Sequence, residues 1–278
     1  MSETRPRVLY VTDLAYQARG RRYCDEDIVL TSRLRHRFDL ATCHPDDAAA
    51  LMSSFDVVVV RNMGPVIHRQ AAHADFCARA VAAGARVYNE LTGRADMRGK
   101  QYLLDLFAQD FPVIPTIERL DDVDRLPAVH SYVAKPELGA DSVGLQVVSR
   151  DDLAGLDWDG LLVQPRIDFL HEVSFFYVDD AFVHALYAPD PERRWELVPY
   201  EPDEDDLAFA RRFIDWNTIT HGIQRVDACR TRGGDLLLVE LEDLNPYLSL
   251  DRLPAEAQET FVEAFAAAIS RLAATTGR

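Results

Sequence analysis

The sequence predicts an open α/β domain followed by a region of the α+β class. Strand and helix patterns alternate over residues 7–90, whereas strand patterns follow one another directly from residue 131 onward. The chain has 278 residues, of which 48% are hydrophobic and 27% charged, so its composition is that of a globular protein. This length is sufficient for one large domain or for several small ones that share a core.

In the first part of the chain, the valine run at 57–60 is continuous, which is typical of a strand buried on both faces of a sheet. Residues 25–37 repeat apolar side chains at helical spacing, and a second helix over 68–83 would end at Gly84. The predicted strands of this part are 7–13, 38–43, 56–61 and 86–89.

In the second part, a helix over about 94–109 carries Lys100 and is ended by the prolines that follow it. Amphipathic helices are predicted over 203–216 and 254–274. The predicted strands are 131–136, 144–149, 161–167, 172–178, 181–188, 224–230 and 235–242.

The charge of the chain excludes some partners. A net charge of −16 repels nucleic acid and anionic membranes, so neither is an expected partner. The longest apolar runs, such as 57–60 and 236–239, are too short to span a bilayer, and no apolar stretch follows residues 1–5 as in a signal peptide. The four cysteines form no CxxC motif, which argues against a zinc knuckle or a redox pair. A cytoplasmic location is therefore expected.

Lysine is almost absent from this chain. Only Lys100 and Lys135 stand among its 30 basic residues, and all the others are arginine. An ammonium group is a compact point charge, whereas a guanidinium group is a planar fork, so the two are not interchangeable. These two lysines are therefore candidates for a task that arginine cannot perform.

Two arginine positions leave alternatives open. The segment 19–22, Arg-Gly-Arg-Arg, follows the first strand and is either a solvated loop or a site for a substrate anion; it does not match the dinucleotide fingerprint. Arg61 ends a buried strand, where ligands bind in open α/β sheets. It is predicted either to contact a substrate or to be a surface charge.

Six short motifs follow one another over residues 90–272. They are Lys100, Lys135 before Pro-Glu-Leu-Gly, Gln164 in Val-Gln-Pro-Arg-Ile, Glu172-Val-Ser174, Arg225-Val-Asp227, and Glu240-Leu-Glu242 with Asn245-Pro. In this order they resemble the ATP-grasp superfamily of carboxylate ligases, in its glutathione-synthetase-like group, and above all the subgroup of the D-cycloserine-forming cyclo-ligase. The resemblance implies a pre-ATP-grasp α/β domain over 1–92. An ATP-grasp fold of two α+β subdomains would follow, the lid over 93–167 and the catalytic subdomain over 168–278.

The resemblance implies ATP and Mg²⁺ as cofactors. ATP is an anion that this acidic protein must neutralise locally, and the family positions of both lysines match that need. Lys100 and Lys135 would bind phosphates, with Lys135 also catalytic, and Gly139 would lie in the loop that closes over the triphosphate. The other nucleotide contacts implied are Gln164, Arg166 and Ile167 at the adenine and Glu172 at the ribose.

The family also implies roles at the reacting groups. Arg225 would stabilise the transferring phosphoryl group. The metal ligands would be Asp227, Glu240 and Glu242. The candidates for substrate contact are Arg61, Arg194 and Asn245. Arg61 is a candidate because of its place at a strand end, and Arg194, or its neighbour Arg193, because the subgroup has a basic residue near the phosphates at this place. The subgroup has an acidic residue near the place of Asn245, and this departure separates the chain from the cyclo-ligase pattern.

The spacing of the last two motifs predicts a hairpin with a shared charged face. If Gly233 and Gly234 form a two-residue loop, Asp227 pairs with Glu240 and Arg225 pairs with Glu242. Side chains alternate along strands, so these four groups would lie on one face. Opposed carboxylates repel, and a hard cation such as Mg²⁺ would relieve that repulsion.

The activity expected is ADP-forming ligation. A small-molecule carboxylate, expected to be that of an amino acid, would be activated as an acyl phosphate and then coupled to a nitrogen nucleophile of a second molecule or of the same one. Two alternatives stay open, a kinase-type phosphotransferase on the same scaffold and a non-catalytic nucleotide-binding scaffold. The expected partners are small-molecule carboxylate and amine substrates, and a homodimer is left open.

Overall fold

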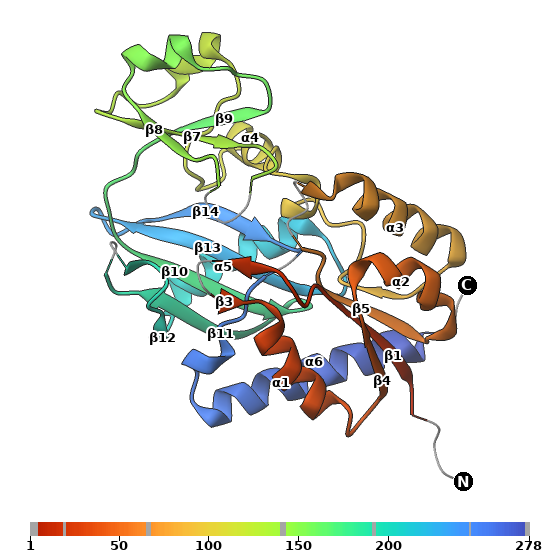
Figure 1. The fold of residues 1–278 in the computed structure, drawn as a ribbon. Helices are drawn as coiled ribbons and strands as arrows, with labels where there is room; N and C mark the ends of the chain where they lie inside the picture. The colour runs from red at the N-terminus through yellow and green to blue at the C-terminus, as the bar shows by residue number, and fades with distance from the viewer. Residues whose placement is uncertain are drawn as a thin grey trace.

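The computed structural model describes residues 5–18, 21–64, 68–139, 143–190, 193–244 and 246–275. The described chain forms three main layers, which Figure 1 shows as an upper lobe, a central sheet and a lower part that includes the N-terminal sheet and the last helix. Within these ranges, no helix combines the length and the apolar character that a membrane span requires.

The N-terminal layer is a parallel sheet of four strands in the order β4-β1-β5-β6. Its strands are β1 (Arg7–Thr12), β4 (Asp39–Cys43), β5 (Val57–Asn62) and β6 (Val87–Tyr88). Alternate residues of β1 and β5 face α1 (Cys24–Leu34) on one side and α2 (Pro45–Leu51) with α3 (Gln70–Ala83) on the other. As predicted, α3 ends at Gly84, whose φ of 61° is left-handed.

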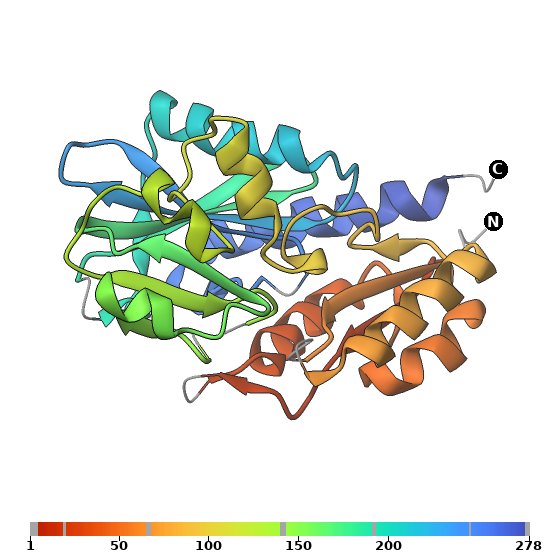
Figure 2. The ribbon, with the colours of Figure 1, turned by 90° about the horizontal axis from the view of Figure 1, so that it is seen from above.

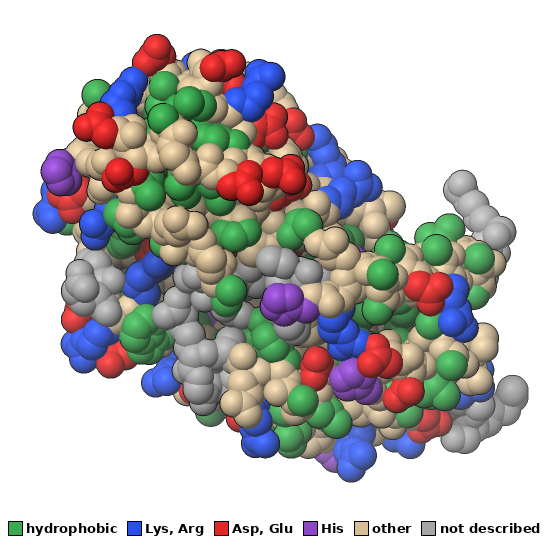
Figure 3. Space-filling view, turned by 45° about the horizontal axis from the view of Figure 1, so that its top comes forward, with side chains coloured by type: hydrophobic (Ala, Val, Ile, Leu, Met, Phe, Trp, Pro, Cys, Tyr) green, Lys and Arg blue, Asp and Glu red, His purple; other side chains and the backbone are tan. Residues whose placement is uncertain are grey.

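The upper lobe is a small antiparallel sheet in the order β8-β7-β9. Its strands are β7 (Tyr132–Pro136), β8 (Gln146–Val148) and β9 (Leu161–Pro165), and they pack on the short 3-10 helices Leu120–Arg125 and Asp151–Gly155. Exposed acidic and basic side chains are interspersed over this lobe and over the body beneath it (Figure 3).

The central sheet is antiparallel, in the order β12-β11-β10-β13-β14. Its strands are β10 (Phe169–Val178), β11 (Ala181–Ala188), β12 (Val198–Tyr200), β13 (Ile223–Thr231) and β14 (Leu236–Glu242). One face packs against α4 (Tyr102–Ala108) and α5 (Glu204–Asn217). Part of the other face packs against α6 (Ala255–Ala274), seen from above in Figure 2.

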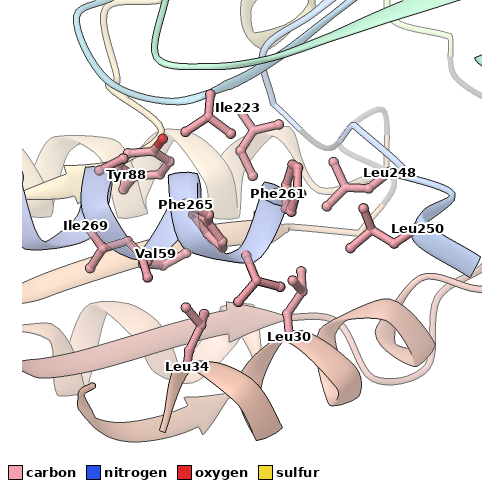
Figure 4. Packing of buried hydrophobic residues seen from close by; sticks show 14 of the residues in the cluster. Leu30, Leu34, Val59, Tyr88, Ile223, Leu248, Leu250, Phe261, Phe265 and Ile269 are labelled. Carbon is pink, nitrogen blue, oxygen red and sulfur yellow. The ribbon is translucent and has the colours of Figure 1, made fainter. Parts of the chain in front are cut away.

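Helix α6 joins the central sheet to the N-terminal layer. Phe261, Phe265 and Ile269 are fully buried, with Leu30 and Leu34 of α1 on one side and Ile223 of β13 on the other (Figure 4). The N-terminal layer and the central sheet therefore share one hydrophobic core.

Two details differ from the sequence-based expectation. The helix predicted over 94–109 is shorter: Asp96–Arg98 forms a 3-10 turn, Gly99 takes a φ of 92°, and α4 begins only at Tyr102. Lys100 thus lies in the turn before the helix, because a residue at Gly99's φ ends helical geometry. The short elements α2, β12 and the hairpin of β2 (Gln17–Ala18) and β3 (Arg21–Arg22) were not predicted.

Candidate active site

A cavity of about 870 Å³ lies over the part of the central sheet that α6 leaves open. Its walls come from three sources: strands β10, β13 and β14, the segment 194–198, and residues from outside the sheet. The last group comprises Tyr23 at the start of α1 and Tyr247, Ser249 and Arg252 after β14.

Strand alternation explains why β10 supplies three polar or aromatic groups to the cavity. Glu172, Ser174 and Phe176 line it, whereas Val173 and Phe175 point into the core on the other face. Ser174 donates a hydrogen bond of 2.6 Å to Asp227 Oδ1 on the neighbouring strand.

The β13–β14 hairpin has the charged pairs that the sequence predicts. Asp227 is opposite Glu240 and Arg225 is opposite Glu242. All four line the cavity.

The loop that produces this register is not the predicted one. The backbone N–H of Thr231 donates to the carbonyl of Asp235, so the loop has three residues, and a bulge at Val239 shifts the later pairs by one. As a result Val239 lines the cavity beside Glu240, instead of pointing into the core as expected.

Arg225 is the centre of the charged cluster. It donates from Nε to Asp227 Oδ1 at 2.9 Å and from Nη2 to Asp227 Oδ2 at 2.8 Å, and it pairs with Glu242. It also donates from Nη1 to the carbonyl of Tyr247 at 3.0 Å. Burial raises the pKa of Glu242 above its usual value, and Asp227 adds to the effect while Arg225 opposes it.

The two lysines lie close to each other, and Lys100 contacts the cluster through Glu240, although neither lysine lines the cavity. The ammonium group of Lys100 pairs with Glu240, and its backbone N–H donates to the carbonyl of Glu137, two residues beyond Lys135. Burial, together with the nearby positive charge of Lys100, lowers the pKa of Lys135 to about 7. The fold therefore places two like charges together although 35 positions separate them in the sequence.

Glu172 and Arg194 form an ion pair at the cavity wall. Arg194 Nε lies 2.6 Å from one carboxylate oxygen of Glu172 and Nη2 lies 2.5 Å from the other. Burial raises the pKa of Glu172, although Arg194 opposes that shift.

The remaining nucleotide candidates lie in or beside the upper lobe. Gly139 donates its N–H to the Pro136 carbonyl at 3.1 Å, and a Cβ at this position would lie 3.1 Å from that oxygen, so glycine fits the close turn. The buried side chain of Gln164 donates to Thr116 at 2.8 Å. Arg166 and Ile167 lie in the link between β9 and β10, where the Arg166 N–H donates to the Ser131 carbonyl.

Two substrate candidates are not placed in the cavity. Arg61 is 3% exposed, lies 3.4 Å from Asp27 Oδ1, and donates to the carbonyl of Pro246 at 3.1 Å. It is not among the residues that line the cavity, and its burial shows that it is not a surface charge. Asn245 lies outside the described residues.

The carboxylates at the site suit a hard cation in their chemistry but are not gathered around one point. Among the described residues, no three acidic, histidine or cysteine groups converge as a ready metal site. Asp227, Glu240 and Glu242 are instead paired with Arg225 or Lys100.

Sequence reasoning missed several lining residues. Ser174 is part of one of the motifs but was not assigned to the site; it could have been, because it stands two positions after Glu172 and so shares its face. Tyr23 and Arg252 carry no such local pattern, since their place in the cavity depends on how distant elements pack.

Known proteins resemble this chain over most of its length. No protein-family model matches it. The cycloserine biosynthesis protein DcsG of Streptomyces lavendulae is 26% identical over 245 residues, which cover 75% of this chain and 82% of that protein. The crystal structure of D-cycloserine synthetase DcsG matches with a TM-score of 0.73 and 23% identity, over 95% of this chain and 99% of that one.

Two further structures have the same arrangement. The ATP-grasp ligase PsnB, in complex with a phosphomimetic precursor variant, Mg and ADP, matches with a TM-score of 0.65 at 14% identity, over 97% of this chain and all of that one. The D-alanine–D-alanine ligase of Bacillus anthracis, in complex with ATP, matches with a TM-score of 0.64 at 10% identity, over 98% and 99% of the two chains. The chain therefore has the fold of the ATP-grasp ligases, and the resemblance predicted from its motifs is confirmed.

Proposed function

We propose that this protein is an ATP-dependent carboxylate–amine ligase that forms ADP and phosphate. The observation that carries the proposal is a carboxylate-lined cavity with Arg225 in its wall, Lys100 paired with the wall residue Glu240, and Lys135 close to Lys100. Adjacent like charges are unfavourable unless an anion neutralises them, and the phosphates of ATP are an anion of the required charge.

The proposed reaction has two steps. An oxygen of the substrate carboxylate attacks the γ-phosphorus of ATP, the bond to the ADP oxygen breaks, and an acyl phosphate forms. A nitrogen lone pair then attacks the acyl carbon, phosphate leaves, and the nitrogen loses a proton. The chain's own contribution is to orient the reactants and to neutralise the charge that moves between them.

Each residue of the cluster has a proposed part in this reaction. Lys100 and Lys135 bind phosphate oxygens, and Arg225 stabilises the transferring phosphoryl group. Asp227, Glu240 and Glu242 would hold Mg²⁺, which supplies further charge neutralisation when it is bound with the nucleotide. The D-alanine–D-alanine ligase supports an amino acid as the acid, whereas the PsnB structures contain a precursor peptide.

The nucleotide would lie between the upper lobe and the central sheet. We propose that Gly139 belongs to the loop over its phosphates, that the backbone around Gln164, Arg166 and Ile167 lies at the adenine, and that Glu172 binds the ribose. The proposed boundaries are residues 1–92 for the N-terminal domain, 93–167 for the lid and 168–278 for the catalytic subdomain.

Arg194 and Asn245 remain the proposed substrate contacts. Arg194 lines the cavity and is held by Glu172. It would exchange that carboxylate for a substrate or phosphate oxygen as ligands enter.

A hydroxylamine trap tests the proposed reaction. The protein is incubated with Mg·ATP, hydroxylamine, and a panel of L- and D-amino acids and small hydroxy acids. An acyl phosphate reacts with hydroxylamine to give a hydroxamate, so we expect hydroxamate and ADP in equal amounts with one class of acid. ADP release with a stable phosphoester and no hydroxamate would show a kinase instead, and nucleotide binding without any ADP release would show a scaffold.

A further inference from the structure

The segment 246–250 forms a wall of the cavity although most of it belongs to no helix or strand. Tyr247 and Ser249 line the cavity, whereas Leu248 and Leu250 point into the core beside Phe261 (Figure 4). The position of this main chain therefore determines where the side chains of Tyr247 and Ser249 lie in the cavity.

Buried charged groups of the N-terminal layer hold this main chain. Glu26 in the first turn of α1 accepts hydrogen bonds from the N–H groups of Leu248, at 2.9 Å, and Leu250, at 3.1 Å. Arg61 at the end of β5 donates to the carbonyl of Pro246 at 3.1 Å. Glu26 is 7% exposed and Arg61 is 3% exposed, so water cannot readily replace either contact.

A third buried group fixes Arg61. Asp27 lies 3.4 Å from Arg61 Nε, and it accepts hydrogen bonds from the hydroxyls of Tyr10 at 2.8 Å and Thr12 at 2.5 Å. A buried charge is tolerated when it is paired and hydrogen-bonded. The neighbouring residues Glu26 and Asp27 thus have different parts. Glu26 accepts hydrogen bonds from the segment, and Asp27 holds Arg61, which also binds the segment.

The location of the segment points to the acid substrate and not to the nucleotide. Lys100 contacts the cluster through its pair with Glu240, whereas Arg225 donates to the Tyr247 carbonyl and so lies directly against the segment. In the proposed reaction the lysines bind the nucleotide phosphates and Arg225 contacts the transferring phosphoryl group. The segment that contacts Arg225 would therefore lie beside the acceptor of that group, which is the acid substrate.

We propose that Glu26 and Arg61 are positioning residues for the acid substrate, acting through the main chain of segment 246–250 without touching the substrate. This inference rests on the proposed ligase function for its catalytic part. In this proposal the buried Arg61 positions the main chain of the segment and does not contact the substrate directly.

The variant Glu26→Gln tests the proposal because it keeps the shape of the side chain. Its amide can accept one of the two N–H groups but presents its own N–H to the other. We expect hydrogen–deuterium exchange of the Leu248 and Leu250 amides to become at least about tenfold faster. With the acid that gives most hydroxamate in the trap, KM for the acid should rise about tenfold, while KM for ATP changes less than about twofold.

Glu259→Gln is the matched control. Glu259 lies on α6 and pairs with Arg33 of α1 at 2.8 Å, but its side chain is 59% exposed. This variant should leave both the exchange rates and the two KM values unchanged. Arg61→Met should likewise speed amide exchange in the segment and raise KM for the acid. Arg61→Lys should show smaller changes than Arg61→Met, because an ammonium group can still donate to the Pro246 carbonyl.

The outcomes separate this proposal from the ligase proposal. Unchanged exchange in Glu26→Gln overturns the inference, and so does an equal rise of both KM values. If the wild-type protein forms hydroxamate with no acid of the panel, the proposed function fails. The exchange rates alone then decide whether Glu26 holds the segment.

Discussion

At the scale of single residues, Lys135 has an unusual protonation state. Its pKa is lowered to about 7, so at pH 8 about nine-tenths of the side chain is neutral in the free protein. Phosphate oxygens favour the ammonium form and raise that pKa. We therefore expect ATP binding to take up close to one proton at pH 8 and almost none at pH 6, measured by calorimetry in two buffers of different ionisation enthalpy.

The variants Lys135→Ala and Lys135→Arg test whether the proton taken up on ATP binding goes to Lys135. Lys135→Ala should bind ATP more weakly and with no proton uptake. Lys135→Arg should not fully restore turnover, because a guanidinium fork replaces a point charge and does not titrate in this range. Proton uptake that persists in Lys135→Ala would contradict the assignment.

Arg225 is predicted to affect turnover more than nucleotide affinity. Removing one group that stabilises charge in a transition state typically costs about 3 kcal/mol, or roughly a hundredfold in kcat. Arg225→Ala should show a fall of that order in steady-state ADP release, with a smaller change in ATP affinity. Arg211→Ala is the control, since Arg211 forms exposed pairs on α5. An unchanged kcat in Arg225→Ala would refute the role.

At the scale of elements, the β13–β14 hairpin shows what spacing can predict. The pairs Asp227–Glu240 and Arg225–Glu242 were correct, but the loop is one residue longer than expected and the bulge at Val239 compensates for it. Local pattern specifies that charged groups must share a face. It does not specify where a bulge restores the register, because that depends on how Leu236, Leu238 and Leu241 fit the core.

The two loop glycines provide a test of this geometry. Gly234 has a φ of 96°, whereas Gly233 has no such left-handed conformation. Gly234→Ala should therefore destabilise the protein by about 1 kcal/mol, and Gly233→Ala should change stability little. Urea unfolding measures both. Equal destabilisation by the two variants would favour the two-residue loop, in which both positions require positive φ.

The less accurate expectations have a common physical cause. Lys100 was expected within a helix, but Gly99 has a positive φ beside Leu138, and the Lys100 N–H donates to the Glu137 carbonyl of the upper lobe. Arg61 was expected at a ligand edge of the sheet. That edge is covered by segment 246–250, and a contact across 185 residues leaves no local pattern in the sequence.

At the scale of the whole molecule, the shared core predicts cooperative unfolding. Phe265 is fully buried between α1, Tyr88 and the central sheet, so Phe265→Ala should cost about 3–5 kcal/mol. The tryptophans, at 158, 195 and 216, all lie outside the N-terminal layer. Their fluorescence and far-UV circular dichroism should nevertheless report one coincident urea transition, in the wild type and in Phe265→Ala.

Glu263→Gln serves as the control on the same helix, because Glu263 makes only an exposed pair with Arg37 among its described contacts. It should change the midpoint little. Separate transitions for the two probes would show that the protein does not unfold as one cooperative unit.

The ion pairs of the cluster have a consequence for ligand cooperativity. Lys100 pairs with Glu240, and Arg225 pairs with both Asp227 and Glu242, so neither the cations nor the carboxylates are available without losing a partner. A nucleotide that attracts the lysine releases a carboxylate for the metal, and a metal that takes the carboxylate releases the lysine for the nucleotide. Each ligand should therefore strengthen the binding of the other by the same factor. Titrations of ADP with and without Mg²⁺, compared in Glu240→Gln, should show this mutual dependence shrink in the variant.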